Sequence, residues 1–315
     1  MKHSLKIVSI LLGMFFITQL IGIVVVNQYS PQVKQVVDEQ GNITNQVTYN
    51  LPYGLDPPET TKGSIWKVVF FLAVSLTLAV LIMFILMRYG AGLIIKTWFF
   101  IVVVLSLGIT FNAFLFKIPQ GASISLIIAV AFAYVKIVKR NIIVHNLTEL
   151  AIYPGIGAIF VALILSWTTK PILAVATMLI FLSIYDMYAV WHAGFMQKMA
   201  NYQIKKLRIF TGFFVPYLGK KQRDIIRQSK TNKKLKGKKI KVNVAILGGG
   251  DVVFPIILTG VVLITLGLMQ AIIISIGATF ALAFLFYISK KGKFYPAMPF
   301  ISIGCLIALG ISLFL

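Results

Sequence analysis

The sequence predicts an all-α polytopic membrane protein, and three observations carry that prediction. The chain of 315 residues is 59% hydrophobic and only 12% charged, with a mean hydropathy of +0.92. A soluble domain cannot cover that much apolar surface with so few charges. Several apolar runs reach the length of about 17 to 25 residues that crosses a bilayer as a helix. The runs are continuous and do not alternate, which excludes a membrane β-barrel.

Nine transmembrane helices account for the long apolar runs. The first run, Ile7 to Val26, is followed by no small-residue cleavage site, so we expect an uncleaved span and not a signal peptide. The fourth run is short, and glycines interrupt the seventh. We expect the spans at residues 5–26, 65–87, 93–116, 121–138, 146–168, 171–194, 242–266, 270–289 and 295–314.

The placement of lysine and arginine tests this count, because cytoplasmic loops carry an excess of both. Lys2 and Lys6 precede the first span, so we expect a cytoplasmic N-terminus. Every basic-rich connection then falls on the inner side and every basic-poor connection on the outer side. The alternation places the C-terminus, Leu315, outside.

The connection at residues 198–241 holds 15 of the 30 basic residues and one acid, Asp224. It divides the chain into an N-terminal six-span part (1–197), a basic cytoplasmic loop (198–241) and a C-terminal three-span part (242–315). The net charge of +22 then indicates contact with anionic lipid and not with nucleic acid. Within this loop, the apolar and basic residues from Tyr202 to Tyr217 suggest a segment that lies at the membrane surface.

The outer segment 28–64 is basic-poor and contains valines and threonines in two short runs. Val33–Val37 and Val47–Tyr49 flank Gln40-Gly41, so we expect a small hairpin there.

Three of the eight acidic residues lie in predicted spans: Glu149, Asp186 and Asp251. A charged group at membrane depth costs roughly 2.5 to 3.5 kcal/mol on insertion scales, so it is a functional candidate by default. Glu149 lies near the cytoplasmic start of its span, four residues after His145. For Glu149 we favour an interfacial pair with His145 over a role in chemistry.

Asp186 and Asp251 lie deeper and at matching levels. Asp186 is 12 residues from Lys198 and Asp251 is 10 residues from Lys241, which corresponds to about 18 Å and 15 Å of helix. Their spans are consecutive and antiparallel, so the two carboxyl groups can face each other. Two close carboxyl groups share a proton. Such a pair suits amide hydrolysis, in which one takes a proton from water and the other donates to the carbonyl oxygen.

The acids alone leave other functions open. A proton- or ion-coupled transporter also uses paired intramembrane acids, and a membrane scaffold could hold acids for structural reasons. The neighbouring residues favour a protease. Gly248, Gly249 and Gly250 let another chain approach closely, although they also suit helix packing. Pro296 and Pro299 impose a non-helical start on the last span, although prolines also cap helices.

At these positions the chain resembles the GxGD intramembrane aspartyl proteases, the presenilin and signal peptide peptidase family. Tyr185-Asp186 matches the YD of the sixth span, Gly248-Gly249-Gly250-Asp251 the GxGD of the seventh, and Pro296-Ala297-Met298-Pro299 the PALP of the ninth. The three motifs occur in the family's order and on the expected spans. Archaeal presenilin-type homologues are the most similar group. Prepilin peptidases also carry a GxGD but lack the PAL element, so they are a distant alternative.

The resemblance implies that Asp186 and Asp251 are the catalytic pair and that Tyr185 lies beside them. It implies that the three glycines shape the site and that Pro296 to Pro299 hold the substrate or the form of the site. Met298 departs from the usual leucine, but it is apolar and similar in volume, so we expect the site to survive.

The resemblance also implies substrates that are transmembrane helices. We expect no metal or other cofactor, no obligatory partner subunit, and a location in the cell membrane of a prokaryote, with an archaeon favoured. The cytoplasmic N-terminus agrees with presenilins. The residues Asp251 to Pro255 and the short inner loop agree with the peptidase branch.

Overall fold

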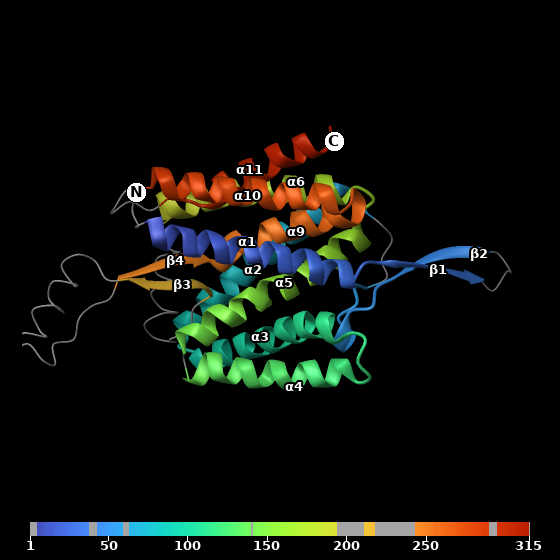
Figure 1. Cartoon of the computed structure of the whole chain (residues 1–315), viewed down its shortest axis with the longest axis horizontal. Coiled ribbons are helices and arrows are strands. Elements are labelled where there is room, and N and C mark those ends of the chain that lie inside the picture. Colours follow the sequence, from blue (N-terminus) through green and yellow to red (C-terminus); the bar gives the residue numbers. More distant parts are fainter. Residues whose placement is uncertain are drawn as a thin grey trace, which may run out of the picture.

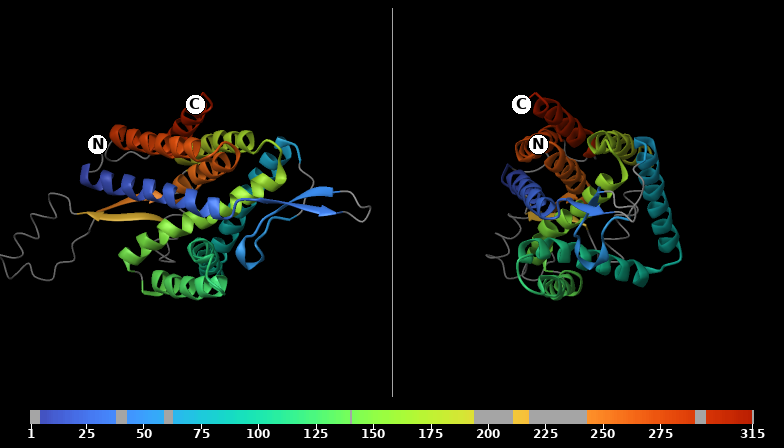
Figure 2. Two further views of the ribbon diagram at one scale, coloured as in Figure 1. Left: turned by 45° about the vertical axis from the view of Figure 1, so that its right-hand side comes forward. Right: turned by 90° about the vertical axis from the view of Figure 1, so that its right-hand side faces the viewer.

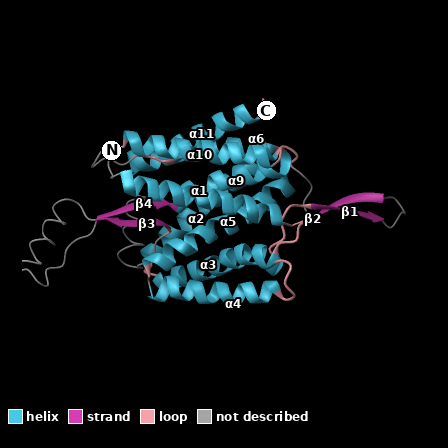
Figure 3. Cartoon of the chain, in the orientation of Figure 1, coloured by secondary structure: helices cyan, strands magenta, loops and turns pink. Residues whose placement is uncertain are grey.

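The structure is a computed structural model that describes residues 5–37, 43–58, 63–139, 141–193, 211–217, 243–289 and 295–314. Within these ranges, long α-helices form one bundle, and two small hairpins lie at opposite ends of it (Figures 1 and 3). The helices are α1 (Leu5–Gln28), α2 (Ile65–Arg88), α3 (Gly92–Leu115), α4 (Gly121–Tyr134), α5 (Ile142–Trp167), α6 (Pro171–Tyr188), α9 (Gly249–Thr265), α10 (Leu268–Ile288) and α11 (Met298–Ser312).

Shorter elements complete the bundle. A 3-10 turn, η1 (Pro52–Gly54), precedes α2, and π-helical turns η2 (Val135–Lys139) and η3 (Ala189–Ala193) extend α4 and α6. The strands β1 (Gln32–Val37) and β2 (Ile43–Thr48) pair antiparallel. This pairing confirms the predicted hairpin, whose turn lies outside the described residues. The strands β3 (Gly212–Tyr217) and β4 (Asn243–Gly248) form the second antiparallel pair.

Seven helices in the described part of the chain are long and apolar enough to cross a membrane. They are α1, α2, α3, α4 with η2, α5, α6 with part of η3, and α10; α9 and α11 are apolar but shorter. Every predicted span except the seventh starts within a few residues of the start of a described helix. The largest difference among them is at α5, which begins at Ile142 and not at residue 146.

The predicted seventh span was wrong at its start. Residues 243–248 form strand β4 and not the first turns of a helix, and α9 begins at Gly249. The reason is a partner strand far away in the sequence: Phe213 pairs with Leu247, and Val215 with Ala245. Burial alternates along β4, where Ala245 and Leu247 are buried and Val244 and Ile246 are exposed. That period of two is the mark of a strand.

Strand β3 also corrects the prediction of a segment at the membrane surface. Phe213 is fully buried and Val215 nearly so, so this end of the predicted segment packs into the protein. The remainder of it, residues 202–210, lies outside the described residues.

Helix α9 lies at the centre of the bundle. It packs against α1, α5, α6, α10 and α11, and its residues from Ile256 to Leu263 are all buried. A helix that is apolar on all sides is suited to such a place. Helix α2, by contrast, lies at the edge of the bundle and buries very little of its surface (Figure 2). The core therefore holds Asp251 on its most enclosed helix.

Candidate active site

The first predicted aspartate lies near the end of α6. Asp186 is partly buried, and α6 packs against both α9 and α11. The Asp186 Oδ2 atom accepts a hydrogen bond from the backbone N–H of Met298 at 3.1 Å. One of the predicted catalytic groups is therefore joined to the PAL-like motif, 112 residues further along the chain.

The start of helix α11 explains why that backbone N–H is available. Helix α11 begins at Met298 and carries Pro299 in its first turn, where the first N–H groups of any helix lack partners inside the helix. A negative carboxylate at a helix N-terminus also gains from the helix dipole. Next to this contact, the Ser183 hydroxyl donates to Ser302 Oγ at 2.9 Å, which ties α6 to α11. These serines were not singled out in the sequence.

The second predicted aspartate follows directly from the strand-to-helix junction. β4 ends at Gly248, and Asp251 lies in the first turn of α9. A Cβ atom on Gly248 would lie 3.0 Å from Asp251 Oδ2, so the carboxyl group folds back over this glycine. Asp251 and Asp186 are close enough for their charges to interact. This interaction is consistent with the prediction that the two acids face each other. The depth estimated for Asp251 assumed a helix from Lys241 onward, and it does not apply because residues 243–248 form a strand.

The remaining two glycines differ in their surroundings. Gly249 lies under the ring of Tyr153: an added Cβ would come within 2.8 Å of Cε1 and 2.9 Å of the hydroxyl oxygen. At Gly250 an added Cβ would meet only Phe254, at an ordinary 3.7 Å. Close approach therefore requires glycine at position 249, and the space beside it is already filled by the protein's own tyrosine.

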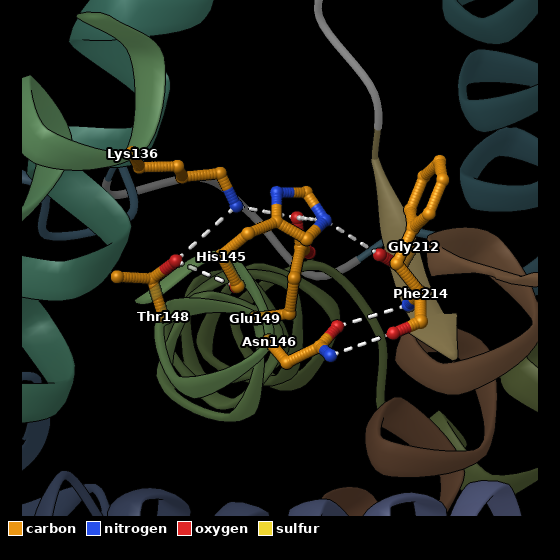
Figure 4. A network of polar contacts seen from close by, with 7 residues as sticks. All are labelled: Lys136, His145, Asn146, Thr148, Glu149, Gly212 and Phe214. Carbon is orange, nitrogen blue, oxygen red and sulfur yellow. Dashed lines mark hydrogen bonds and ion pairs between the residues drawn. The ribbon is translucent and has the colours of Figure 1, made fainter. Parts of the chain in front are cut away.

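A side chain of α5 holds strand β3 as a neighbouring strand would (Figure 4). The Asn146 side chain donates from Nδ2 to the Phe214 carbonyl at 2.7 Å and accepts from the Phe214 N–H at 2.9 Å. His145 donates from Nε2 to the Gly212 carbonyl at 2.8 Å. Pro216, further along this edge, has no N–H to offer. The outer edge of β3 is thus closed, and within the described residues β4 has no neighbour other than β3.

Glu149 is buried inside the protein. Its predicted contact with His145 is present, at 3.5 Å, and its side chain is only 1% exposed. Its main partner is Lys136 of η2, which is also buried and which donates to Thr148 at 3.4 Å as well. The pair joins η2 to α5 and therefore depends on the fold.

Sequence reasoning also missed Gln19. It is fully buried on α1, and its Nε2 donates to the carbonyl of Val252 at 3.1 Å, the residue after Asp251. The signal available in the sequence was a lone amide in an apolar span.

Tyr185, the neighbour of Asp186, is partly buried. Among the described residues, no group of three or more His, Cys, Asp or Glu side chains lies together in a way that could hold a metal ion.

Residues 12–315 match the family described as signal-peptide peptidase, presenilin aspartyl protease. The chain belongs to this family. Two solved structures of a presenilin family intramembrane aspartate protease, in P2 and C222 space groups, share its fold. The first has a TM-score of 0.59 and 19% identity and covers 96% of both chains; the second has 0.60 and 18% and covers 97% of this chain and 98% of the other. Among curated proteins, none matches the chain by sequence.

Family membership and the apolar helices make this chain a multi-pass membrane protein and an intramembrane aspartyl protease. The resemblance stated from the three motifs is confirmed. The transporter considered from the acids alone is not supported.

Proposed function

We propose that Asp186 and Asp251 form the catalytic dyad that hydrolyses peptide bonds within transmembrane helices of substrate proteins. The observation that carries this proposal is the convergence of three distant segments: Asp186 bonds to the Met298 amide and interacts with the charge of Asp251. Tyr185 flanks the dyad, Gly248 to Gly250 shape it, and Pro296 to Pro299 hold Asp186 in place.

The reaction needs one proton on the pair. The ionised carboxylate takes a proton from water, whose oxygen attacks the substrate carbonyl carbon, while the other carboxyl group gives its proton to the carbonyl oxygen. The tetrahedral gem-diol then collapses: its C–N bond breaks as the protonated carboxyl group gives its proton to the leaving nitrogen, and one hydroxyl of the diol returns its proton to the ionised carboxylate as the carboxylic acid product forms. One proton again remains on the pair, and neither a metal nor another cofactor takes part.

The substrate strand is proposed to lie along β4. The outer edge of β3 is closed by His145 and Asn146, whereas β4 leads directly into Gly248 and Asp251. An extended peptide that pairs with an open strand edge gains main-chain hydrogen bonds at each alternate residue. A substrate helix that unwinds there would present its carbonyl groups near the dyad.

Substrate entry from the lipid is proposed between α2 and α6. A cavity of about 330 Å³ lies there, lined by α2, α5, α6 and α9, with Ala73 and Ala79 on one side and Met178, Leu182 and Phe254 on the other. Since α2 buries little of its surface, its displacement breaks few contacts.

The membrane arrangement is proposed to be nine spans, with α9 and α11 as the two short ones. In Figure 1, the start of α1 and the β3–β4 pair lie at one end of the bundle and β1–β2 at the other. This supports a cytoplasmic N-terminus and basic loop, the latter against anionic lipid, and an external C-terminus. We also propose that the basic loop at residues 198–241 divides the chain into its three parts, and that the protein lies in the cell membrane of a prokaryote, with an archaeon favoured.

Cysteine labelling tests this arrangement. The sequence contains one cysteine, Cys305, and it is fully buried, so single cysteines can be added to the natural chain. Cysteines at positions within 220–240 should react only from the cytoplasmic side. Reaction from the outer side would overturn the proposed orientation.

The activity is tested with the purified single chain, reconstituted with a labelled single-span substrate. Asp186→Ala and Asp251→Ala should each abolish cleavage, while Asp56→Ala, which removes an acid from the outer segment, should retain it. Cleavage that survives either active-site substitution would sink the dyad mechanism. Wild-type cleavage without any other protein would show that partner subunits are not obligatory.

A further inference from the structure

A column of polar side chains runs along one face of α5 toward Asp251. His145, Glu149 and Tyr153 are spaced four residues apart, so they lie on successive turns of one face. Glu149 is 1% exposed and Tyr153 is 3% exposed, and both lie in a helix suited to crossing a membrane. Polar groups buried in this way cost free energy unless they find partners.

Two atoms of this column make no well-formed hydrogen bond among the described residues: Glu149 Oε2 and Tyr153 Oη. The Tyr153 hydroxyl nevertheless lies near enough to the Glu149 side chain for a weak hydrogen bond, and it interacts electrostatically with Asp251. A buried hydroxyl without a hydrogen bond costs about 1 to 3 kcal/mol. Phenylalanine would fill the same space without that cost, so the hydroxyl needs a reason other than stability.

Tyr153 also touches the glycine segment directly. Its hydroxyl oxygen lies 2.9 Å from the Cβ position of Gly249, while the Cβ position of Gly248 faces Asp251 Oδ2 at 3.0 Å. Of these two consecutive glycines, Gly248 therefore faces Asp251 and Gly249 faces Tyr153. The Tyr153 ring packs edge-on against Phe213 of β3, with ring centres 5.6 Å apart. The position of Tyr153 thus determines where the backbone runs two residues before Asp251.

We propose that Tyr153 is a positioning residue for Asp251, and that the Lys136–Glu149 ion pair holds its hydroxyl in place. Lys136 neutralises Glu149, which allows that carboxylate to remain beside the phenol in a buried site. The hydroxyl then interacts with both carboxyl groups, and its contact with Gly249 sets the course of the backbone there. This role rests on the proposed catalytic function of Asp251. A displacement of about 1 Å at a reacting group can lower the rate about a hundredfold.

Tyr153→Phe is the direct test, because it removes the hydroxyl and keeps the ring. The number of active sites is counted by titration with a peptide that carries a hydroxyl-containing transition-state isostere. We expect an unchanged count, an unchanged or higher Tm, a KM within about twofold of wild type, and a kcat lower by about tenfold or more.

Tyr53 offers a matched control, because it also covers a glycine. Its hydroxyl lies 3.0 Å from the Cβ position of Gly108, but it bonds to Ser125 Oγ at 2.6 Å and to the Ala122 carbonyl at 3.0 Å. Tyr53→Phe should lower Tm because it removes satisfied hydrogen bonds, and it should leave kcat unchanged.

A second variant removes the ion pair without leaving one charge buried alone. Lys136→Met combined with Glu149→Leu should lower kcat as Tyr153→Phe does, and adding Tyr153→Phe to this pair should lower kcat little further, because the groups act as one unit. Additive losses would overturn the coupling.

A wild-type kcat in Tyr153→Phe, or a kcat loss that only follows a loss of titratable sites, would overturn the positioning role. The two proposals fail separately. If Asp186→Ala and Asp251→Ala abolish cleavage while Tyr153→Phe cleaves normally, the positioning role is wrong and the dyad stands.

Discussion

At the scale of single residues, the sequence was most informative about the two aspartates. A carboxyl group in an apolar run is so costly that the sequence alone identifies Asp186 and Asp251 as functional candidates. Their supporting contacts could not be found in this way. The Met298 N–H, the Gln19 amide and the Tyr153 hydroxyl act through contacts with other elements of the fold. Such contacts depend on packing, which no local pattern reveals.

The glycines of the strand-to-helix junction give a residue-scale prediction. Gly249→Ala places a Cβ within 2.8 Å of Tyr153, whereas Gly250→Ala meets only Phe254 at 3.7 Å. We expect Gly249→Ala to lower the free energy of unfolding by about 1 to 3 kcal/mol through overpacking and to lower activity. Gly250→Ala should behave like wild type in thermal unfolding and in cleavage. Equal effects of the two substitutions would contradict this account of the junction.

At the scale of elements, helices were predicted well and the second pair of strands was not. Continuous apolar character identifies a spanning helix by itself. The pairing of β3 with β4 joins segments separated by the basic loop, so neither strand signals its partner. The apolar run after residue 242 hid the alternation of exposed Val244 and buried Ala245.

Asn146 gives the element-scale prediction, because it is the contact that holds β3. Asn146→Leu leaves the Phe214 N–H and carbonyl without partners, at a cost of about 1 to 3 kcal/mol for each buried group. A loosened β3–β4 pair should present the substrate in more than one register. Mass spectrometry of the products should therefore show additional cleavage positions.

Asn141 on the same helix is the control for this experiment. Its side chain caps the start of α5 by accepting from the Ile143 and Val144 N–H groups. Asn141→Ala should cost about 1 kcal/mol of stability and leave the cleavage positions unchanged. A single unchanged cleavage position in Asn146→Leu would rule out the control of register.

At the scale of the whole molecule, composition predicts the fold class, an apolar helical membrane protein, and seven helices in the described part of the chain are long enough to cross a membrane. How the helices pack was not predicted, because apolar helices in lipid associate through shape and small residues and not through a readable pattern. The central place of α9 and the peripheral place of α2 are examples. Both matter for function, since one helix carries Asp251 and the other lines the proposed entrance.

Filling the cavity between α2 and α6 tests that entrance. Ala79 lines the cavity, so Ala79→Phe should obstruct a transmembrane substrate and raise its KM several-fold. A short peptide that reaches the dyad from water should be cleaved as before. Ile82→Phe, at an exposed position of the same helix, is the matched control. Equal loss for both substrates would point to a damaged fold and not to a blocked entrance.

The short helix α11 has a consequence for the lipid around the protein. Its 15 residues span about 22 Å, less than the hydrocarbon thickness of about 30 Å. Ile303, Ile307 and Ile311 on this helix are more than half exposed, so acyl chains contact it directly. As the proposed ninth span, α11 would require the bilayer to compress beside it, at a cost of fractions of a kcal/mol per Å of mismatch. Vesicles with longer acyl chains should therefore strain the helix that supplies the Met298 amide to Asp186, and hydrophobic mismatch becomes a means of tuning the protease.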